Sequence, residues 1–331
     1  MSVVNQQSWD DFIKSNPDVH VLQTTQWGRF KAEFGWKPKY LICGNSGAQL
    51  LFRRLPLGLS IGYIPKGPVG TNWYDLLVES EILSRDLKAI VLYIEPDYWE
   101  EEFDVSDLLN AGFSRSDNPI QPQRTLTISL RGSEDDWLSK MKQKTRYNIR
   151  LAIKKEVKVE SSNDINSFIS LMSLTGQRDK FAIHSRDYYQ RVFEIFSGSG
   201  KCVLLIARYQ GRPIASLMAF SQGNRAWYFY GASDDNERNR MPTYLLQWEA
   251  MRWVASQGCL EYDLWGVPDE NENILEENFL KRSDGLWGVY RFKRGFGGEL
   301  KRSAGVYKKV LNNHLFPVYQ KLMRYRKGII S

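Results

Sequence analysis

Residues 203–220 read VLLIARYQGRPIASLMAF, two apolar runs joined by the turn-forming sequence Gln210-Gly211-Arg212-Pro213. This pattern predicts a β-hairpin. A third strand is expected in NRAWYFYGAS, residues 224–233, and a fourth in LEYDLWGVPD, residues 260–269. Between them, Pro242 suits the first turn of a helix. The segment therefore predicts three strands, a helix and a further strand, which is an α/β arrangement.

The first half of the chain repeats this order. Strands are expected in AQLLFRRL, residues 48–55, and SIGYIPKGPV, residues 60–69, followed by a helix over residues 74–87 and a buried strand in AIVLYIEPD, residues 89–97. The match between the halves indicates a weak internal duplication, so we expect two α/β domains with a cleft between them. The expected domains comprise residues 1–133 with about 304–331, and residues 134–303.

Length and composition support a folded protein with anionic partners. The chain has 331 residues, which suits two domains of about 150 residues each. Hydrophobic residues make up 42% and aromatic residues 13%, which excludes a disordered chain. The 45 Lys and Arg residues outnumber the 38 Asp and Glu residues, and the net charge of +7 favours nucleic acid, phosphorylated metabolites or an acidic membrane face as partners.

Metal centres, disulfide frameworks and membrane spans are not expected. The cysteines and histidines are isolated from one another in the sequence: Cys43, Cys202, Cys259, His20, His184 and His314. Scattered residues of this kind argue against a zinc site, a His-based triad and a disulfide framework. No signal-peptide pattern and no apolar run of membrane-spanning length occur, so we expect a cytoplasmic protein.

Residues 133–155, SEDDWLSKMKQKTRYNIRLAIKK, predict one amphipathic helix with a basic outer face. Ser133 is a good N-cap, and three acidic residues follow it in the first turn. Basic residues at successive i, i+4 positions would form a row about 18 Å long, which suits several phosphates. A solvated basic face is the alternative. The expected buried stripe comprises Leu138, Met141, Thr145, Ile149 and Ala152.

The C-terminal stretch HLFPVYQKLMRYRKG, residues 314–328, is amphipathic and basic. Two interpretations are open: a helix that returns to pack on the first domain, and a helix that lies on a membrane surface. We favour the first, because an apolar helix face most often packs on its own domain.

The strand and helix order resembles the acetyltransferase-like fold, in which a splayed sheet holds an acyl donor. Those enzymes bind the pyrophosphate of coenzyme A on a Gly-rich turn that opens the helix. Here the corresponding residues 232–248 read ASDDNERNRMPTYLLQW and lack the glycines. Coenzyme A is therefore a poor candidate for the donor, and a different activated acyl group is expected.

A more specific resemblance rests on seven segments that follow one another over nearly the whole chain. They are LQTTQWGRFK (22–31), KGPV (66–69), MKQKTRYNIRLAIKK (141–155), YFYGAS (228–233), YLLQWEAMRWVASQG (244–258), YDLWGV (262–267) and WGVYRFKRGFGG (287–298). Together they resemble the Fem family of peptidoglycan-bridge aminoacyltransferases, of FemA, FemB and FemX type. The resemblance implies two acetyltransferase-like (GNAT-type) domains, an aminoacyl-tRNA donor and a peptidoglycan precursor as acceptor. The implied product is an amide on the side chain of the third residue of the stem peptide.

The chain is similar to the compact FemX type, because it shows no sustained heptad pattern, whereas FemA and FemB types carry a coiled-coil arm. The acceptor implied by that type is the soluble UDP-MurNAc-pentapeptide, and a lipid-linked precursor, with peripheral contact to the inner membrane face, is the alternative. The resemblance implies neither a metal ion nor a cofactor, with aminoacyl-tRNA as a co-substrate.

The resemblance also implies catalytic residues. Lys293 matches the family's lysine near the tRNA acceptor end and is expected to stabilise the oxyanion of the tetrahedral intermediate, with Phe292 beside it. The alternative is that Lys293 and Arg294 are surface charges beside a Gly-rich loop. Glu95 and Asp97 follow a predicted strand, where the family carries an acidic residue. One of them is expected to accept the proton of the attacking amine or to bind the stem peptide, and an ordinary solvated turn is the alternative.

Substrate-binding residues follow in the same way. Lys31 matches the lysine that contacts the pyrophosphate of the acceptor, and Arg186 is a second candidate for phosphate binding. Tyr189, or Tyr188 in its place, is expected to hydrogen-bond or stack on uracil, and Tyr230 either lines the cleft or belongs to the core. The expected tRNA contacts are Lys142, Lys144, Arg146, Arg150 and Lys154.

We therefore expect a cytoplasmic, tRNA-dependent aminoacyltransferase. Two alternatives stay open on the sequence. One is an acyltransferase that modifies another amine with a coenzyme A or carrier-protein donor. The other is a non-catalytic RNA-binding module, for which the basic helix and the aromatic residues would suffice.

Overall fold

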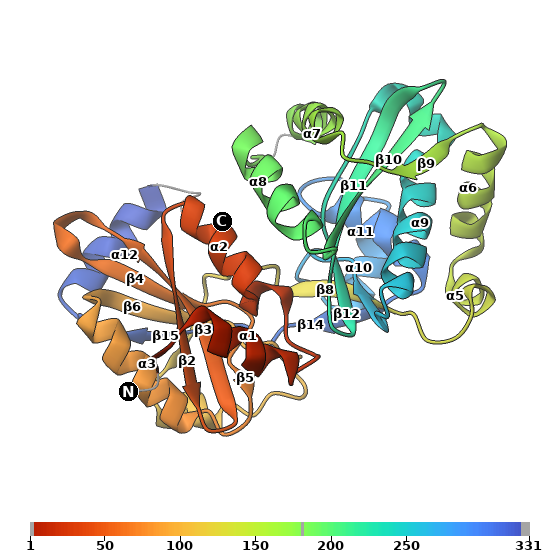
Figure 1. The fold of residues 1–331 in the computed structure, drawn as a ribbon. Helices are drawn as coiled ribbons and strands as arrows, with labels where there is room; N and C mark the ends of the chain where they lie inside the picture. The colour runs from red at the N-terminus through yellow and green to blue at the C-terminus, as the bar shows by residue number, and fades with distance from the viewer. Residues whose placement is uncertain (1–2, 180–181, 326–331) are drawn as a thin grey trace. The chain divides into compact units, whose positions relative to one another are not determined.

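The computed structural model describes residues 3–179 and 182–325, which form two compact α/β units. The first unit comprises Met1–Gln123 with Arg302–Ser331, and the second comprises Arg124–Lys301 (Figure 1). The expected fold class, two acetyltransferase-like α/β domains, is confirmed by the layout of the two sheets. The longest helices among the described residues, α7 (Ile165–Asp179) and α9 (Pro242–Ser256), have 15 residues each, so the described chain contains no coiled-coil arm.

The sheet of the first unit has one parallel strand pair, formed by β4 and β6, among antiparallel neighbours. These two strands are joined by helix α3 (Tyr74–Asp86). The strand order is β1 (Val3–Val4), β2 (Trp36–Cys43), β3 (Ser46–Arg54), β4 (Ser60–Ile64), β6 (Ala89–Ile94), β15 (Val306–Val310) and β7 (Ser114–Ser116), with β5 (Val69–Gly70) paired to β3.

Helices cover both faces of this first sheet. On one face α3 and the short helix α4 (Ser106–Asn110) pack on the apolar side chains that point toward them, among them Leu50 and Leu92. Successive residues of a strand point to opposite faces. The other face, which carries Tyr40 and Gln49, is therefore the one covered by α1 (Gln6–Lys14) and α2 (Thr25–Glu33).

The second unit repeats the strand and helix order. Its parallel pair is β12 and β13, joined by α9, just as α3 joins β4 and β6. The predicted hairpin over residues 203–220 is confirmed: β10 pairs with β11, and Gln210 and Gly211 turn the chain with positive φ. The strand order is β14 (Glu299–Arg302), β8 (Arg124–Ser129), β13 (Glu261–Asp263), β12 (Arg225–Ser233), β11 (Arg212–Gln222), β10 (Cys202–Tyr209) and β9 (Lys158–Ser161).

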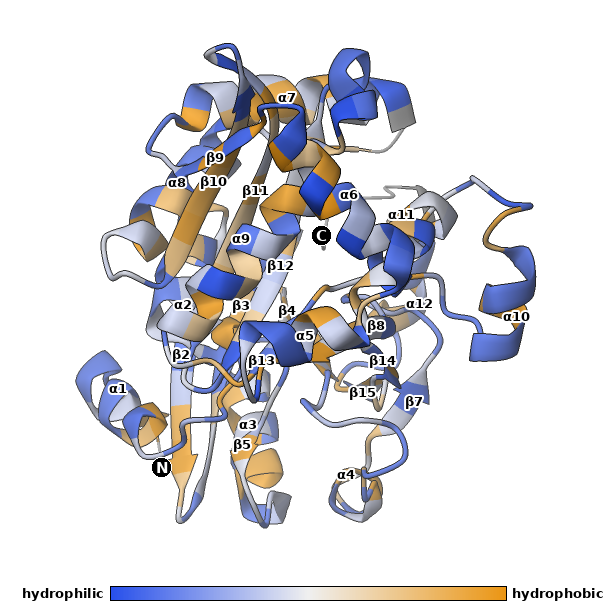
Figure 2. Cartoon of the chain, turned by 90° about the vertical axis from the view of Figure 1, so that its right-hand side faces the viewer, coloured by the Kyte–Doolittle hydropathy of each residue, from blue (hydrophilic) through white to orange (hydrophobic). Residues whose placement is uncertain are grey.

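The core of the second unit lies between its sheet and the helices α5, α6 and α9. Trp137 of α5, Ile149 of α6 and Met251 of α9 are buried against strand residues such as Leu205. Hydrophobic residues predominate along β10 (Figure 2), as expected of a strand inside a covered sheet. The helices of this unit not yet given are α5 (Glu134–Lys140), α6 (Gln143–Lys154), α8 (Arg186–Ser197), α10 (Glu272–Asn278) and α11 (Trp287–Lys293).

The prediction of one continuous helix over residues 133–155 is wrong, because Met141 and Lys142 adopt extended backbone between α5 and α6. The backbone N–H of Lys142 donates to the carbonyl of Gly295 at 2.9 Å, and the Arg146 guanidinium donates to the carbonyl of Met141. Tertiary hydrogen bonds thus replace those of a continuous helix. The N-cap at Ser133 is confirmed, with its side chain and that of Asp136 forming a capping box. All residues of the expected inward stripe are buried or half-buried.

Candidate active site

The side chain of Lys293 is buried at the end of α11. Its Nζ donates hydrogen bonds to the carbonyl oxygens of Trp265, at 3.0 Å, and Gly266, at 2.8 Å. Nζ also lies 5.5 Å from the ring centroid of Tyr228, a cation–π contact. The interpretation of Lys293 as a surface charge is therefore wrong, and its amine is an interior group held by two carbonyls.

The two carbonyls belong to a loop with unusual backbone geometry. Trp265 has a φ of +62°, in the left-handed region that bulky residues rarely adopt. The Oδ1 atom of Asp263 accepts hydrogen bonds from the backbone N–H of Trp265 at 2.6 Å and from the Thr125 hydroxyl at 2.5 Å. Asp263 thereby stabilises the loop conformation that directs both carbonyls toward Lys293.

Burial changes the acidity of this lysine. Desolvation lowers the pKa of Lys293 to about 7, although the nearby Asp263 carboxylate favours the charged form. Near neutral pH the amine therefore exists in both protonation states. A buried lysine with a perturbed pKa, next to a charged partner, is typical of catalytic sites.

Lys293 lies where the parallel strands of the second unit separate. β12 and β13 pair only over Arg225–Trp227 and Glu261–Asp263. Beyond that point β12 continues beside β11, whereas the chain after β13 turns toward β8, where the N–H of Leu264 bonds to Leu126. Tyr228 and Trp265 both contact Lys293; Tyr228 comes directly after the paired part of β12, and Trp265 lies two residues after β13. This is the splayed sheet that the sequence predicted.

The segment around Lys293 is tied to the start of α6. A Cβ on Gly295 would lie 2.1 Å from the Thr145 hydroxyl, so only glycine allows this approach. Arg294 is not a free surface charge, since it forms an ion pair with Glu276 and lies 3.8 Å from the ring centroid of Phe279. The hydrogen-bonded ion pair with Arg294 lowers the pKa of Glu276 to about 2.

Phe292 is half-buried and packs in an aromatic cluster beside Lys293. Its ring centroid lies 5.0 Å from that of Tyr244 and 5.2 Å from that of the buried Phe296. Phe292 and Lys293 are chain neighbours at the end of α11, where the Phe292 ring packs on Tyr244 and Phe296 and the Lys293 amine bonds to the carbonyls of Trp265 and Gly266.

The predicted tRNA contacts fall into two groups on α6. Arg146 is half-buried and donates to the carbonyls of Leu138 and Met141, so it stabilises the end of α5. The other predicted cations are exposed, and Tyr147 adds an exposed aromatic ring between them. We call this surface the basic face of α6; it comprises Lys142, Lys144, Tyr147, Arg150 and Lys154.

The predicted tyrosines come together in the second unit. Tyr188 and Tyr189 of α8 are buried, and the Tyr189 and Tyr230 ring centroids are 5.3 Å apart. His184 stacks on Tyr188 with centroids 3.8 Å apart. Burial raises the pKa of Tyr230 well above its usual value and that of Tyr188 to about 12, so both phenols stay protonated and able to donate.

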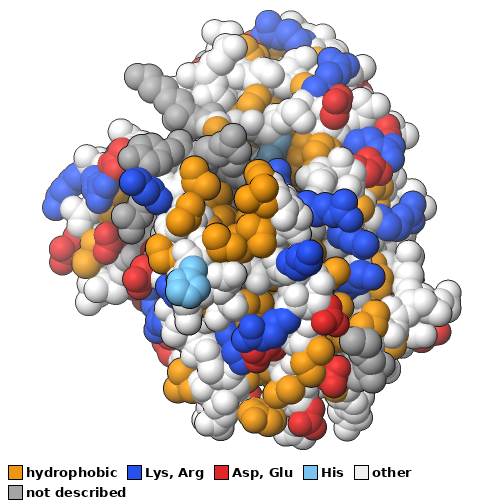
Figure 3. Space-filling model, turned by 90° about the vertical axis from the view of Figure 1, so that its left-hand side faces the viewer, with side chains coloured by type: hydrophobic (Ala, Val, Ile, Leu, Met, Phe, Trp, Pro, Cys, Tyr) orange, Lys and Arg blue, Asp and Glu red, His pale blue; other side chains and the backbone are white. Residues whose placement is uncertain are grey.

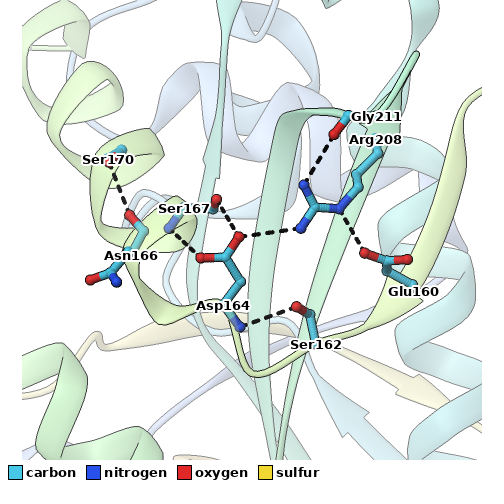
Figure 4. Close-up of polar contacts among 8 residues, drawn as sticks. All are labelled: Glu160, Ser162, Asp164, Asn166, Ser167, Ser170, Arg208 and Gly211. Carbon is cyan, nitrogen blue, oxygen red and sulfur yellow. Dashed lines mark hydrogen bonds and ion pairs between the residues drawn. The ribbon is translucent and has the colours of Figure 1, made fainter.

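Arg186 is exposed in the first turn of α8 and donates to the side-chain oxygen of Asn166. Asn166 belongs to the first turn of α7, which is fixed by a polar network (Figure 4). There Asp164 accepts from the N–H of Ser167 at 3.0 Å and from Arg208 at 3.2 Å. Arg208 also bonds to Glu160 at 2.6 Å, which links α7 to β9 and β10. The partner of Arg186 is thereby held on a rigid element.

Lys31 is buried on α2 in the first unit. Its Nζ lies 5.6 Å from the ring centroid of Trp27. Burial, reinforced by the positive charge of Arg53, lowers the pKa of Lys31 to about 8. A Cβ on Gly28 would lie 2.2 Å from Oε1 of Gln49, so glycine is required for α2 to approach the sheet closely enough to place Lys31 there.

Sequence reasoning missed Arg53 and Tyr319, which face the same side of the first sheet as Lys31. Arg53 pairs with Trp36 across β2 and β3, with its guanidinium 5.7 Å from the Trp36 ring centroid. The hydroxyl of the buried Tyr319, on α12 (Leu315–Tyr325), has no hydrogen-bond partner among the described residues. The strand alternation around Arg53 could have indicated its face, but nothing local in the sequence places Tyr319 there.

Glu95 and Asp97, which the sequence could not separate, differ in environment. Glu95 is buried, and its Oε1 accepts from the backbone N–H groups of Ile120, at 3.2 Å, and Gln121, at 2.9 Å. Its other oxygen accepts from the hydroxyl of Tyr63. Asp97 is half-buried at the end of the strand. Glu95 is therefore not part of an ordinary solvated turn. Its carboxylate fixes the backbone of residues 120–121.

Across residues 3–179 and 182–325, no group of three or more His, Cys, Asp or Glu side chains is arranged to hold a metal ion. In the same part of the chain, no helix is long and apolar enough to cross a membrane.

One protein-family model matches most of the second unit. Residues 139–294 match the acetyltransferase (GNAT) domain family. This range contains the separating strands β12 and β13, the basic face of α6 and Lys293.

The similarity to whole proteins extends over nearly the entire chain. The lipid II:glycine glycyltransferases of Staphylococcus haemolyticus and Staphylococcus epidermidis are 25% and 24% identical to it, and in both cases the alignment covers 97% of this chain and 95% of the relative. The crystal structure of FemX has the same fold, with a TM-score of 0.83, 22% identity and coverage of 96% of this chain and 98% of FemX. The expected resemblance to the Fem family is confirmed.

Replacing Lys293 with Met should change how stability depends on pH. Above about pH 7 the folded amine is neutral, whereas in the unfolded chain it stays protonated up to about pH 10.4. Between these two pH values only the unfolded state holds this proton, so raising the pH makes unfolding less favourable. Relative to Lys293→Met, the wild-type free energy of unfolding should rise by about 3 kcal/mol from about pH 7 to about pH 9.5. Urea titrations of both proteins measure this, and a constant difference would contradict the lowered pKa.

Replacing Glu95 with Gln should destabilise the first unit. The amide that replaces one carboxylate oxygen cannot accept hydrogen bonds, so a buried donor loses its partner, at a cost of about 2 kcal/mol. The matched variant Asp97→Asn alters a half-buried side chain two residues away and should cost less than half as much. Thermal unfolding monitored by circular dichroism compares the two, and equal losses would show that Glu95 is not an anchor.

Proposed function

We propose that this chain, which is similar to Fem-type enzymes over nearly all of its length, is a tRNA-dependent aminoacyltransferase of peptidoglycan-bridge formation. It transfers an amino acid from aminoacyl-tRNA to the side-chain amine of the third residue of a precursor stem peptide. The acceptor is UDP-MurNAc-pentapeptide or its lipid-linked form, and the reaction takes place in the cytoplasm.

The observation that carries this proposal is the environment of Lys293. A lysine with a pKa near 7 lies at the separating strands of a unit that matches the acetyltransferase domain family. Relatives similar over 97% of the chain are named lipid II:glycine glycyltransferases, so the acyl group transferred by them is an amino acid and the acceptor a peptidoglycan precursor. Site and relatives thus point to the same class of reaction.

The reaction needs no external energy source, because the ester of aminoacyl-tRNA is already activated. The neutral acceptor amine attacks the ester carbonyl, a C–N bond forms, and the carbonyl electron pair moves to the oxygen. When the tetrahedral intermediate collapses, the C–O bond to the tRNA ribose breaks. The amine loses one proton, and the leaving ribose hydroxyl gains one.

Lys293 is proposed to stabilise the negative oxygen of this intermediate. Two of the three ammonium protons bond to the carbonyls of Trp265 and Gly266, which leaves one for the oxyanion. Fixed donors of this kind contribute most when they are oriented before the reaction. Phe292, which is half-buried beside the lysine, is proposed to line the path of the tRNA acceptor end.

Candidate ligands for the acceptor lie within each unit. In the first unit Lys31 would contact its pyrophosphate, and Asp97, which is more exposed than Glu95, would bind the amine or take its proton. In the second unit Arg186 is the further phosphate ligand. The phenols of Tyr188 and Tyr189 on the same helix, with Tyr230 beside them, are the hydrogen-bond donors.

A coenzyme A donor is disfavoured by the residues before α9. The connection from β12 carries Asp234, Asp235 and Glu237, where an acetyltransferase would receive a pyrophosphate. Arg240 is already paired with Glu237 at 2.6 Å. Arg178 pairs with Asp235 at 3.0 Å and Arg212 with Glu237 at 2.6 Å, so paired side chains occupy the place where a Gly-rich turn would offer backbone N–H groups to a pyrophosphate. We therefore propose that the enzyme uses no cofactor besides its tRNA co-substrate.

The proposed function is tested by incubating the protein with charged tRNAs and UDP-MurNAc-pentapeptide, or lipid-linked precursor, and measuring product mass. One added amino-acid residue is expected. Lys293→Met should lower kcat by about 10²–10³-fold with little change in KM, because the lost interaction forms only in the transition state. Arg291→Met, an exposed position on the same helix, is the control. Acetyl-coenzyme A serving as donor, or no product from either acceptor, would refute the proposal.

The basic face of α6 is proposed to bind tRNA phosphates. Replacing Lys144 and Arg150 with Glu should weaken tRNA binding and flatten the dependence of log K on log salt by about two units, one for each lost contact. The control is Lys14→Glu with Lys281→Glu, which changes the net charge equally at exposed sites elsewhere. Filter binding over a salt series measures both. An identical loss in the control would mean that only overall charge matters.

A further inference from the structure

Helix α12 leaves an apolar stripe uncovered on the first unit. Phe316 and Tyr319 are buried against the sheet, and Nζ of Lys308 on β15 lies 5.5 Å from the Phe316 ring centroid. Val318 and Leu322, one helical turn apart, are 55% and 60% exposed. The side of the molecule on which α12 lies in Figure 1 faces the viewer in Figure 3, where hydrophobic side chains gather in one patch with lysine and arginine side chains around it.

The C-terminal segment of the chain that contains this stripe carries charge of one sign. Residues 302–331 contain seven Lys and Arg and no Asp or Glu. Two of these cations are paired with acids elsewhere in the unit, Arg302 with Glu100 and Lys309 with Glu81. Lys321, next to Leu322, is exposed. The stripe therefore lies in a cationic segment of the chain.

Helix α3 also carries a pair of exposed apolar residues and can be compared with α12. Val78 and Ile82 have the same i, i+4 spacing on that helix and are 37% and 43% exposed. However, α3 carries four acidic residues, Asp75, Glu79, Glu81 and Asp86, and one basic residue. Single exposed apolar residues are ordinary, so the combination of an apolar pair with unopposed positive charge distinguishes α12 from α3.

We propose that α12 docks the first unit on an anionic lipid surface. Val318 and Leu322 enter the boundary between headgroups and acyl chains, and Lys321 stays among the phosphates. An amphipathic helix with cations on its polar side is attracted to acidic lipids both through buried apolar area and through charge. The alternative occupant, a second copy, would bring two cationic helices together at a symmetric interface, which is unfavourable.

This inference goes beyond the proposed reaction and does not depend on it. Docking requires no tRNA and no acceptor, so it can be measured with the protein alone. Its consequence for function is a choice between the two acceptors, because an enzyme held at the membrane surface meets lipid-linked precursor at high local concentration.

The test is sedimentation of the full chain with vesicles of phosphatidylglycerol and phosphatidylcholine, or of phosphatidylcholine alone. Wild type is expected to bind the anionic vesicles and to dissociate as salt rises. Val318→Asp with Leu322→Asp should lower the partition coefficient about tenfold or more. The matched control, Val78→Asp with Ile82→Asp on α3, makes the same chemical change at the same spacing and should bind as wild type does. Circular dichroism verifies that both variants fold.

A second variant separates charge from apolar contact. Lys321→Glu should weaken binding to anionic vesicles and leave the weak binding to neutral vesicles unchanged. The proposal is overturned if the α12 variant binds as wild type, if the α3 control loses as much, or if sedimentation equilibrium shows a dimer that the α12 variant dissociates.

Discussion

The buried amine of Lys293 imposes a constraint that organises the second unit. An ammonium group removed from water needs acceptors, and two backbone carbonyls supply them. Those carbonyls face the amine only because Trp265 adopts a left-handed conformation, which the carboxylate of Asp263 stabilises from β13. The acidity of the lysine, the course of the loop and the separation of β12 from β13 are thus parts of one arrangement.

The sequence predicted the features that depend on interactions between residues close together in the chain. The hairpin of β10 and β11, the N-cap at Ser133 and the order of strand, helix and strand around α3 and α9 follow from turn residues, caps and apolar periodicity. The break between α5 and α6 could not be predicted in this way, because it depends on a hydrogen bond from Lys142 to Gly295, far along the chain. For the same reason the sequence could not assign Arg146 to a structural role.

For the candidate site, the sequence identified several residues but not the environment of their side chains. Segments shared with Fem-type proteins identified Lys293, Lys31 and Tyr230, yet the burial of the two lysines depends on side chains from other elements. Glu95 and Asp97 are two residues apart and were equivalent in the sequence, but only one of them reaches the backbone N–H groups of residues 120–121. Arg53 and Tyr319 were missed because β3 and α12 meet only in the folded sheet.

The hydrogen bond between Lys142 and Gly295 has a mechanical consequence. It joins Lys142, the first residue of the basic face of α6, to Gly295, which lies two residues after Lys293. The close packing of Gly295 on Thr145 holds the two segments together. Under the proposed function, tRNA bound to the basic face of α6 therefore contacts the same rigid part of the protein that holds the amine of Lys293. The spacing between the proposed tRNA-binding surface and Lys293 is then fixed by the folded protein and does not depend on the flexibility of the tRNA acceptor strand.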